Sequence, residues 1–353
     1  MPDFATLPDR RRTSPEGNPV FQEVSAPQPR WPTRLATTGL TILAAIGALH
    51  FTKPLPQFEE GPFAGFLAKP SRTAYGESGE LKLKFALPGK LLSYPLDVAG
   101  DPSHLTYAWT SLDDTALAGQ PRDLVGSSVA APTKPGFYKL VLVRQGMRRA
   151  VDGLTLAVMV PFTEKTGGLL HGYRIGTYLA ERISGKQPPP EGFLQVTPND
   201  VDIPITRHLR VGDFLNHDDQ TVWPRYAAVS PRLLDKLELV VAEIARWHGS
   251  ADSARLNISI DVHSGFRAPD HNRHVNRAAS DSRHEYGDAA DISIDVDGDG
   301  KYTAQDARML ALAVEIVELK HPDLVGGMGL YLGRRTGPYV HVDARGRRAR
   351  WRG

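Results

Sequence analysis

The sequence predicts an α+β fold in which short strands come before two long helices. Between about residues 71 and 163, apolar and polar side chains alternate with a period of two, as in 81–87, which is typical of half-buried strands. In the second half of the chain, apolar residues recur at helical spacing over 230–249 and 304–319. Further short strands separate and follow these helices without a regular β-α-β repeat. This order favours an α+β domain over a doubly wound one.

The composition narrows the possible classes of protein. A length of 353 residues suggests two or three domains, and 41% hydrophobic with 23% charged residues is ordinary for a globular protein. No cysteine occurs, which excludes disulfides, thiolate zinc sites and a cysteine nucleophile. The net charge is +2, and we expect no nucleic-acid partner. The arginine-rich residues 345–352 suit an anionic polymer, although a solvated run of charge is the simpler interpretation.

The N-terminal region has the pattern of a membrane anchor. Residues 1–33 are rich in Pro, Arg and Ser and predict a disordered cytoplasmic tail. The segment 34–52 has no charged residue after Arg34, and eighteen helical residues would span about 27 Å. Because basic residues precede it, we expect one retained helix in a bacterial inner membrane, with all later domains in the periplasm. A short buried helix is the alternative, and residues 53–70 are expected to form a Pro-rich linker.

The alternating region 71–163 predicts a small β-sandwich. Its clearest strand candidates after 81–87 are 106–110, 136–144 and 154–162, with turn residues between them. None of its residues suggests catalysis, so a spacer or a module that binds an envelope protein is expected. A connecting region is expected to follow over 164–204.

The C-terminal region 205–353 contains the strongest helix signal. Ser230 is a candidate N-cap, Pro231 suits the first helical position, and Gly249 follows the last turn. The second amphipathic helix is expected over 304–319. Four strands are expected, at 256–262, 289–296, 329–332 and 339–343.

Two histidines and one aspartate in this region have the character of metal ligands. His284 and Asp291 are separated by a glycine and alanines, and His341 stands on the last predicted strand. A catalytic zinc ion commonly takes three such ligands and leaves one position for water. Zinc also lowers the pKa of that water, so hydroxide becomes available to attack a carbonyl. If the three side chains converge, a metallohydrolase is expected; the alternative is polar residues in surface turns.

These residues stand in motifs that resemble the M15 peptidases, the zinc D-alanyl-D-alanine carboxypeptidases and their murein endopeptidase relatives, which share a fold with the hedgehog signalling domain. The resemblance covers about residues 205–353. Its motifs occur in the order Ser264-Gly-Phe-Arg267-Ala-Pro269-Asp-His-Asn272, Ser282-x-His284-x-x-Gly287-x-Ala289-x-Asp291 and Val340-His341-Val-Asp343. The residues Asp343, Arg350 and Trp351 look most like the periplasmic murein endopeptidase branch. The resemblance therefore implies a hedgehog-like zinc peptidase domain.

The resemblance also implies roles for single residues. His284, Asp291 and His341 would bind zinc. Arg267 matches an arginine that binds a substrate carboxylate, which a guanidinium can grip with two hydrogen bonds. A structural ion pair is the alternative for Arg267. Ser282 and Asn272 are expected to hold ligands or loops in place.

The general base of the family has no obvious counterpart here. Several members place an acid three residues before the last histidine ligand, where this chain has Pro338, and some place a histidine two residues before it, where this chain has Tyr339. Asp343 is the nearest remaining carboxylate and shares a strand face with His341. We therefore expect Asp343 to act either as the base or as a group that orients His341; a salt bridge to a tail arginine is the alternative.

A second motif predicts a structural calcium ion. Hard calcium takes six to eight oxygen ligands, which a twelve-residue loop of the DxDxDG type supplies. The expected ligands are Asp295, Asp297, Asp299, Asp306 and the backbone carbonyl of Lys301. An acidic turn without calcium is the alternative.

Together these features predict a membrane-anchored, zinc-dependent peptidase. Its expected substrates are peptidoglycan stem peptides or cross-links, with an endopeptidase slightly favoured over a carboxypeptidase. The alternative is a non-catalytic protein that keeps the metal and binds or organises the cell wall.

Overall fold

The computed structural model describes residues 63, 67–93, 96–99, 104–114, 116–124, 128–250, 258–333 and 337–353. It has a mixed α+β architecture with many strands and few helices, as the sequence predicts. The predicted cytoplasmic tail, the predicted membrane anchor at 34–52 and most of the linker lie outside these residues. Within them, no helix has both the length and the apolar character needed to cross a bilayer.

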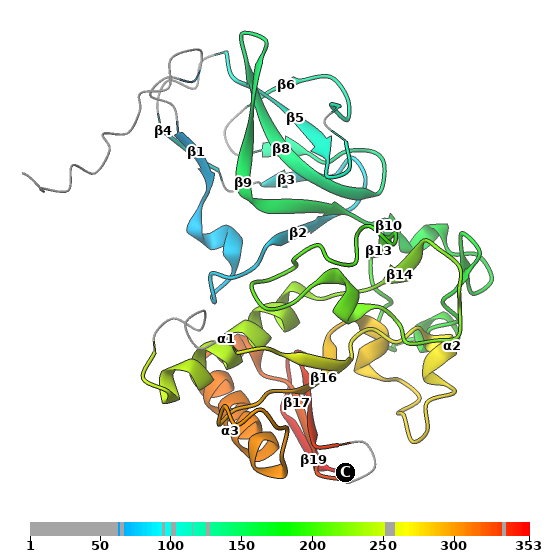
Figure 1. Cartoon of the computed structure of the whole chain (residues 1–353). Coiled ribbons are helices and arrows are strands. Elements are labelled where there is room, and N and C mark those ends of the chain that lie inside the picture. Colours follow the sequence, from blue (N-terminus) through cyan, green and yellow to red (C-terminus); the bar gives the residue numbers. More distant parts are fainter. Residues whose placement is uncertain are drawn as a thin grey trace, which may run out of the picture. The chain divides into compact units, whose positions relative to one another are not determined.

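The region that follows the linker is built almost entirely of strands (Figure 1). Its main sheet has the order β2-β9-β8-β5-β6, and the two pairs β1-β4 and β3-β7 accompany it. Buried side chains of the sheet and of β3 and β7 form one core, which includes Trp109, Leu140, Leu142 and Leu156. The bounds are β1 Leu67–Pro70, β2 Leu83–Ala86, β3 Leu91–Ser93, β4 Leu96–Ala99, β5 Thr106–Ser111, β6 Arg122–Asp123, β7 Ser128–Ala130, β8 Gly136–Arg144 and β9 Met147–Val158.

Short elements connect this region to the C-terminal domain. A three-stranded sheet has the order β10-β13-β14, and β11 pairs with β12. The strands are β10 Val160–Pro161, β11 Leu169–Leu170, β12 Tyr173–Arg174, β13 Gly192–Val196 and β14 Arg225–Ala227. Three-residue or four-residue 3-10 helices also occur, at Arg72–Tyr75, Phe162–Glu164, Leu179–Glu181 and Val211–Phe214.

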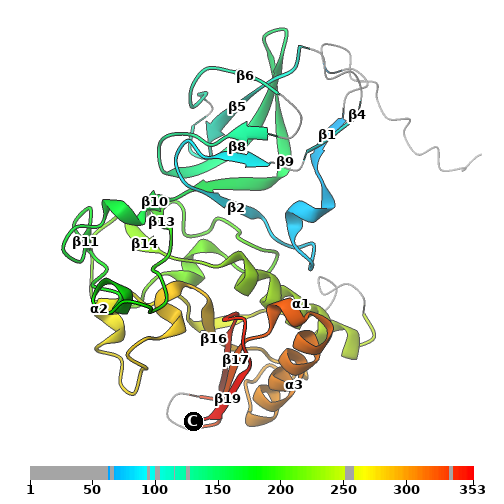
Figure 2. The same ribbon diagram turned by 180° about the vertical axis from the view of Figure 1, so that it is seen from behind.

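The C-terminal domain is a five-stranded sheet with two long helices beside it (Figure 2). The sheet order is β15-β16-β18-β17-β19; all neighbours are antiparallel except β17 and β19, which are parallel. Helices α1 and α3 contact each other, and α3 also contacts β16, β17 and β18. The bounds are α1 Pro231–Trp247, β15 Asp261–Ser264, α2 Pro269–Asn272, β16 Ala289–Ser293, α3 Ala304–Lys320, β17 Gly327–Tyr331, β18 Tyr339–Asp343 and β19 Ala349–Arg352, with 3-10 helices at Arg283–Tyr286 and Pro322–Leu324.

Local sequence signals account for the ends of both long helices. Helix α1 begins after Ser230 with Pro231 in its first turn, where the missing N–H of proline removes no helical hydrogen bond. Helix α3 begins at a capping box in which Thr303 and Asp306 each satisfy backbone N–H groups of the other. These helices therefore lie within a residue or two of their predicted bounds.

The C-terminal arginines form part of the sheet, which the sequence did not predict. Strand β19 pairs with β17, and its Arg350 binds Glu315 and Glu318 of α3. Arg348 also binds Glu315, at 2.8 Å. Ion pairs thus hold Arg345, Arg348 and Arg350, whereas Arg347 and Arg352 are exposed, as the expected solvated run of charge would have them.

The strand-rich region and the C-terminal domain share a hydrophobic core. Leu83 and Ala157 of the former belong to the same buried cluster as residues of α1, α3 and β18. At the boundary, the Asp235 carboxylate of α1 accepts hydrogen bonds from the backbone N–H groups of Glu77 and Ser78, each at 2.9 Å. The expected domain at 71–163 is therefore packed directly onto the domain with the candidate ligands.

Candidate metal centre

Three elements bring the predicted ligands together. His284 lies in the 3-10 helix at Arg283–Tyr286, Asp291 on β16 and His341 on β18, where Asp291 and His341 face each other across the strand pair. Between the first two ligands, Gly287 adopts a left-handed conformation with φ 69°. A Cβ atom there would lie 2.2 Å from the carbonyl oxygen of Ala228, so only glycine allows this turn.

The three ligand atoms have the spacing of a zinc site. His341 Nδ1 lies 2.9 Å from Asp291 Oδ1 and 3.1 Å from His284 Nε2, and the remaining pair is 3.3 Å apart. Metal–ligand bonds of about 2.0–2.1 Å in a tetrahedron place neighbouring ligand atoms about 3.3 Å apart. All three side chains are buried, and they are one of two such groups among the described residues. The geometry therefore fits a tetrahedral ion with one position left for solvent.

In each histidine, the ring nitrogen that points away from the centre forms a hydrogen bond, and this bond determines whether the other nitrogen has a free lone pair for a metal. His284 Nδ1 lies 2.7 Å from the carbonyl oxygen of Gly265, which can only accept, so Nδ1 carries the proton and Nε2 does not. His341 Nε2 lies 3.3 Å from a carboxylate oxygen of Asp343, which leaves Nδ1 unprotonated in the neutral ring. Two lone pairs and the Asp291 carboxylate then meet within about hydrogen-bond distance without a proton to share. A cation between the three atoms would accept their lone pairs and offset the repulsion between them. Zinc commonly binds histidine nitrogens and carboxylate oxygens of this kind.

The charges of the three groups also favour a bound cation. Burial lowers the pKa of His284, which keeps its ring neutral and able to bind a metal. Burial opposes ionisation of Asp291, yet its contacts with His284 and His341 hold the pKa of its carboxyl well below the usual range. For His341, burial is outweighed by the carboxylates of Asp291 and Asp343, which raise the pKa of the ring. The two carboxylates thus favour a positive charge at this centre, which a bound metal ion would supply.

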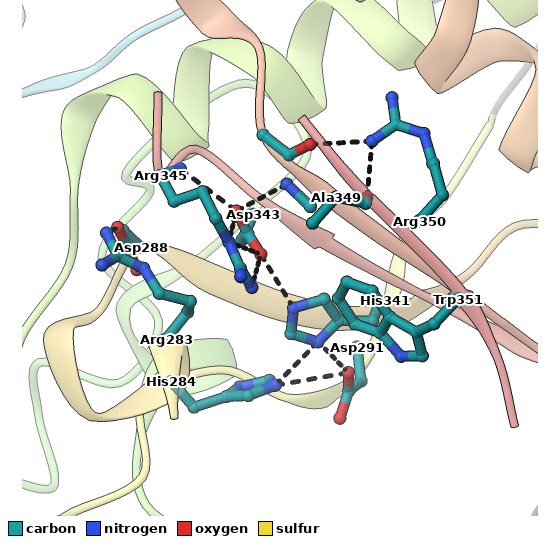
Figure 3. Close-up of polar contacts among 12 residues, drawn as sticks. Arg283, His284, Asp288, Asp291, His341, Asp343, Arg345, Ala349, Arg350 and Trp351 are labelled. Atoms are coloured by element: carbon teal, nitrogen blue, oxygen red, sulfur yellow. Dashed lines mark hydrogen bonds and ion pairs between the residues drawn. The ribbon is translucent and has the colours of Figure 1, made fainter. Parts of the chain in front are cut away.

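Asp343 lies on the far side of His341 from the centre (Figure 3). Its carboxylate contacts His341 Nε2, whereas Nδ1 of the same ring faces Asp291. It also accepts hydrogen bonds from the Arg345 guanidinium and from the backbone N–H of Gly327, and its side chain is fully buried. Despite burial, these donors lower its pKa far below the usual range. From this position Asp343 can orient the His341 ring, which is one of its two predicted roles. The salt bridge to a tail arginine, the predicted alternative, is also present. A general base would instead need to face the position that a metal leaves open for water.

Arg267 forms an ion pair with the candidate metal ligand Asp291. Its guanidinium lies 2.5 Å from Asp291 Oδ2, and its Nε donates to Ser264 Oγ at 2.7 Å. This is the ion pair that the sequence left open as the alternative to substrate binding. The guanidinium also lines the pocket in front of the centre, so substrate binding stays a prediction.

Asn272 and Ser282 lie at the two ends of the loop 273–282. The amide of Asn272 donates to the Ala279 carbonyl at 2.8 Å and to Glu285 Oε1 at 2.6 Å. Ser282 is buried and its carbonyl accepts the backbone N–H of Glu285. Asn272 thus holds the loop, and burial raises the pKa of its partner Glu285 to about 7.

A large pocket opens in front of the ligand atoms. Its volume is about 920 Å³, and it is lined by all three candidate ligands, by Arg267, and by residues of the loop 273–282 and of β19. Three aromatic residues for which the sequence predicts no role in the site also line it: Tyr331, Tyr339 and Trp351. The Tyr331 and Tyr339 rings stack with centroids 4.5 Å apart.

Trp351 reaches the centre across a glycine. The strand register places His341, Gly329 and Trp351 side by side on β18, β17 and β19. Because Gly329 has no side chain, the indole ring lies 5.1 Å from the His341 ring and donates from Nε1 to Tyr331 Oη at 2.9 Å (Figure 3). Only the parallel pairing of β19 with β17 creates this contact, and no local sequence signal indicates it.

The predicted calcium loop gathers three of its carboxylates. Oxygens of Asp295, Asp297 and Asp299 lie within 4.8 Å of one another. The Asp306 carboxylate is not among them, because it accepts hydrogen bonds from Val296 N, Asp297 N and both Thr303 N and Oγ1. Lys301 donates its N–H to Asp299 at 2.8 Å. Asp306 therefore caps the helix in this structure, whereas the sequence predicts it as a calcium ligand. Calcium binding at the loop stays a prediction.

Comparison with known families agrees with the geometry. The family model described as Peptidase M15 matches residues 236–312, which include His284 and Asp291. No curated protein matches the chain. His341 lies beyond the matched segment, and the fold brings it to the other two ligands. The match therefore supports an M15 family peptidase, and the matched residues lie within the C-terminal domain.

Proposed function

We propose that this protein is a zinc-dependent peptidase that hydrolyses peptide bonds in peptidoglycan stem peptides or cross-links. The observation that carries the proposal is the meeting of three candidate ligand atoms, His284 Nε2, Asp291 Oδ1 and His341 Nδ1, whose residues line a pocket of about 920 Å³. A pocket of this size lies within the range of ligand-binding sites in proteins. The M15 match supports peptidase chemistry, and the resemblance of Asp343, Arg350 and Trp351 to the murein endopeptidase branch slightly favours an endopeptidase over a carboxypeptidase.

The residues of the pocket have separable tasks in this reaction. His284, Asp291 and His341 would hold zinc, which, when bound, polarises a carbonyl and lowers the pKa of water. Arg267, fixed by Asp291 and Ser264, directs its guanidinium at the pocket and would hold a substrate carboxylate. Tyr339 would stay protonated and able to donate a hydrogen bond, because burial raises the pKa of its phenol to about 12.

Asp281 is the candidate proton acceptor in this proposal, because its carboxylate lines the pocket and is not one of the candidate metal ligands. The pocket is lined by two carboxylates, Asp281 and Asp291, and Asp291 is already a metal ligand. One oxygen of Asp281 accepts a hydrogen bond from Tyr286 at 2.5 Å, which leaves the other to take a proton from the attacking water. We infer that Asp281 takes the role that Pro338 cannot fill.

The experiment uses the purified chain with defined muropeptides, in the presence of zinc or of a chelator. Zinc-dependent release of new amino and carboxyl termini, identified by mass spectrometry, supports the peptidase and identifies the bond that is cut. Asp291→Asn is expected to lose zinc and activity together, and Asp281→Asn to keep zinc while kcat falls by about 10²–10⁴-fold. Binding of muropeptides without cleavage would instead support the non-catalytic wall-binding protein.

We also propose that residues 34–52 anchor the chain in a bacterial inner membrane with the peptidase domain in the periplasm. The support is the uncharged run after Arg34 and the arginines before it. Fractionation of cells and protease access from the periplasmic side test this. Recovery of the intact chain in the soluble cytoplasmic fraction would contradict it.

A further inference from the structure

The pocket in front of the candidate ligand atoms is rich in arginine. Five arginines line it and no lysine or glutamate does, whereas its acidic residues are Asp281 and the metal ligand Asp291. Three of these guanidinium groups already have carboxylate partners: Arg267 with Asp291, Arg283 with Asp288, and Arg345 with Asp343. The other two are Arg277 and Arg352.

Neither Arg277 nor Arg352 has a protein partner within the described part of the chain. Both are exposed, and neither side chain forms a hydrogen bond or ion pair there. Arg277 belongs to the loop 273–282, and Arg352 to β19, so they approach the pocket from two separate elements. Two unpartnered guanidinium groups on one pocket are available to bind an anion in solution.

The backbone around Arg277 indicates a constrained position. Its φ of 62° lies in the left-handed region, which residues with a Cβ adopt at a cost of about 1 kcal/mol or more and which is common at binding sites. The loop that holds it is tied down where Asn272 donates to the Ala279 carbonyl. A fixed loop places the guanidinium at the pocket with less loss of entropy when an anion binds.

Arg352 is held in place by the sheet. It pairs with Leu330 in the parallel register of β17 and β19. The neighbouring Trp351 is fixed by its hydrogen bond to Tyr331 and by its contact with His341. Strand pairing therefore fixes the backbone of Arg352 at the edge of the sheet that carries His341 and Asp291.

We propose that Arg277 and Arg352 are specificity-determining residues that bind carboxylates of the substrate on either side of the bond that is cut. The substrate class is then a peptide with at least two free carboxylates near that bond, in addition to any carboxylate held by Arg267. A guanidinium binds a carboxylate through two parallel hydrogen bonds, whereas a neutral carboxamide cannot form this charged pair. This inference rests on the proposed function, because it names the substrate of the same site.

The test compares pairs of synthetic stem peptides that differ only in having free carboxylates or carboxamides beside the scissile bond. The full chain with zinc is expected to cleave the carboxylate form with a kcat/KM about 10–100-fold higher, mainly through KM. Arg277→Gln and Arg352→Gln are each expected to lower this preference by about three- to tenfold, and the double variant by more. Arg277→Lys and Arg352→Lys should restore part of it.

Arg347→Gln is the matched control, because Arg347 is an exposed arginine of the same C-terminal segment that does not line the pocket. It removes the same charge and should leave the preference unchanged. An equal loss in all three variants would show a nonspecific effect of net charge and overturn the proposal. Equal cleavage of both peptide forms by the unsubstituted chain would also overturn it, yet leave the peptidase function standing; no zinc-dependent cleavage of either form would instead reject the proposed function.

Discussion

At position 329, a glycine separates a metal-binding histidine from the indole of Trp351. A Cβ atom at Gly329 would lie 2.3 Å from Trp351 Nε1, too close for the ring to stay in place. Gly329→Ala is therefore expected to displace the indole, break its hydrogen bond to Tyr331 and destabilise the fold by about 1–3 kcal/mol. Thermal unfolding measures this, and in a Trp351→Ala background the same substitution should cost much less. An equal cost in both backgrounds would show that the indole is not the cause.

Asp343 provides a second test at the residue scale, because it contacts the ligand His341 rather than the centre itself. Asp343→Asn keeps the shape but weakens the hold on the His341 ring, so zinc affinity should fall by about 10–100-fold. Competition with a chromophoric chelator measures the affinity. Unchanged affinity with lost turnover would mean that Asp343 transfers a proton, which its position behind His341 does not favour.

At the scale of elements, the loop 273–282 depends on a buried carboxyl group. Burial raises the pKa of Glu285 to about 7, so the folded state binds its proton more tightly than the unfolded chain does. The contribution of this proton to the free energy of unfolding is fully present below the unfolded pKa of about 4.3. It is lost as the pH rises through 7. Glu285→Gln cannot ionise and should gain about 1–3 kcal/mol relative to the unsubstituted chain between pH 5 and pH 8.

The measurement for Glu285 is the unfolding free energy of the metal-free protein at both pH values. The exposed Glu77→Gln serves as control and should show no such gain. A pH-independent difference for Glu285→Gln would contradict the raised pKa.

At the start of α3, a substitution can distinguish two roles of Asp306, helix cap and calcium ligand. The Asp306 carboxylate accepts four hydrogen bonds at the helix N-terminus, from Val296 N, Asp297 N, Thr303 N and Thr303 Oγ1. Asp306→Ala should cost about 1–2 kcal/mol by loss of the cap, equally with and without calcium. Melting temperatures in calcium and in chelator measure this. A loss that appears only in calcium would restore Asp306 as the calcium ligand that the sequence predicts.

At the scale of the whole molecule, the strand-rich region and the peptidase domain behave as one folding unit in this structure. They share a buried cluster, and Asp235 of α1 binds two backbone N–H groups of residues 77–78. A Cβ atom at Gly76 would lie 2.6 Å from this carboxylate, which shows how closely the two parts approach. We therefore expect a single unfolding transition, with Asp235→Ala lowering its midpoint by an amount that corresponds to about 1–3 kcal/mol.

Calorimetry distinguishes this from two independent domains. Two transitions, of which Asp235→Ala shifts only the one that belongs to the peptidase domain, would contradict a shared core. The same packing implies that a fragment of the peptidase domain alone exposes apolar surface, so activity is best measured on the longer chain.

The helix ends and the candidate ligands of the C-terminal domain could be predicted from the sequence, because they depend on residues that are near one another along the chain. Ser230 with Pro231 and the Thr303 cap determine where α1 and α3 begin. The pattern His284, Gly287, Asp291 and the alternation around His341 indicated the ligands, since glycine turns and strand faces are local properties. The membrane anchor, the hedgehog-like fold and an envelope partner for the strand-rich region stay predictions from the sequence.

Tertiary structure alone decided which side chains meet. Strand β19 pairs with β17, and its Arg350 binds Glu315 and Glu318 of α3. The position of α3 relative to β19 is a tertiary property that no local sequence pattern contains. For the same reason, the sequence could not show that Trp351 contacts His341, that Arg267 binds Asp291, or that Asp343 lies behind the ring and not beside the open position. Residue types and local spacing determined which groups can bind zinc, whereas strand order and register determined which of them face the same point in space.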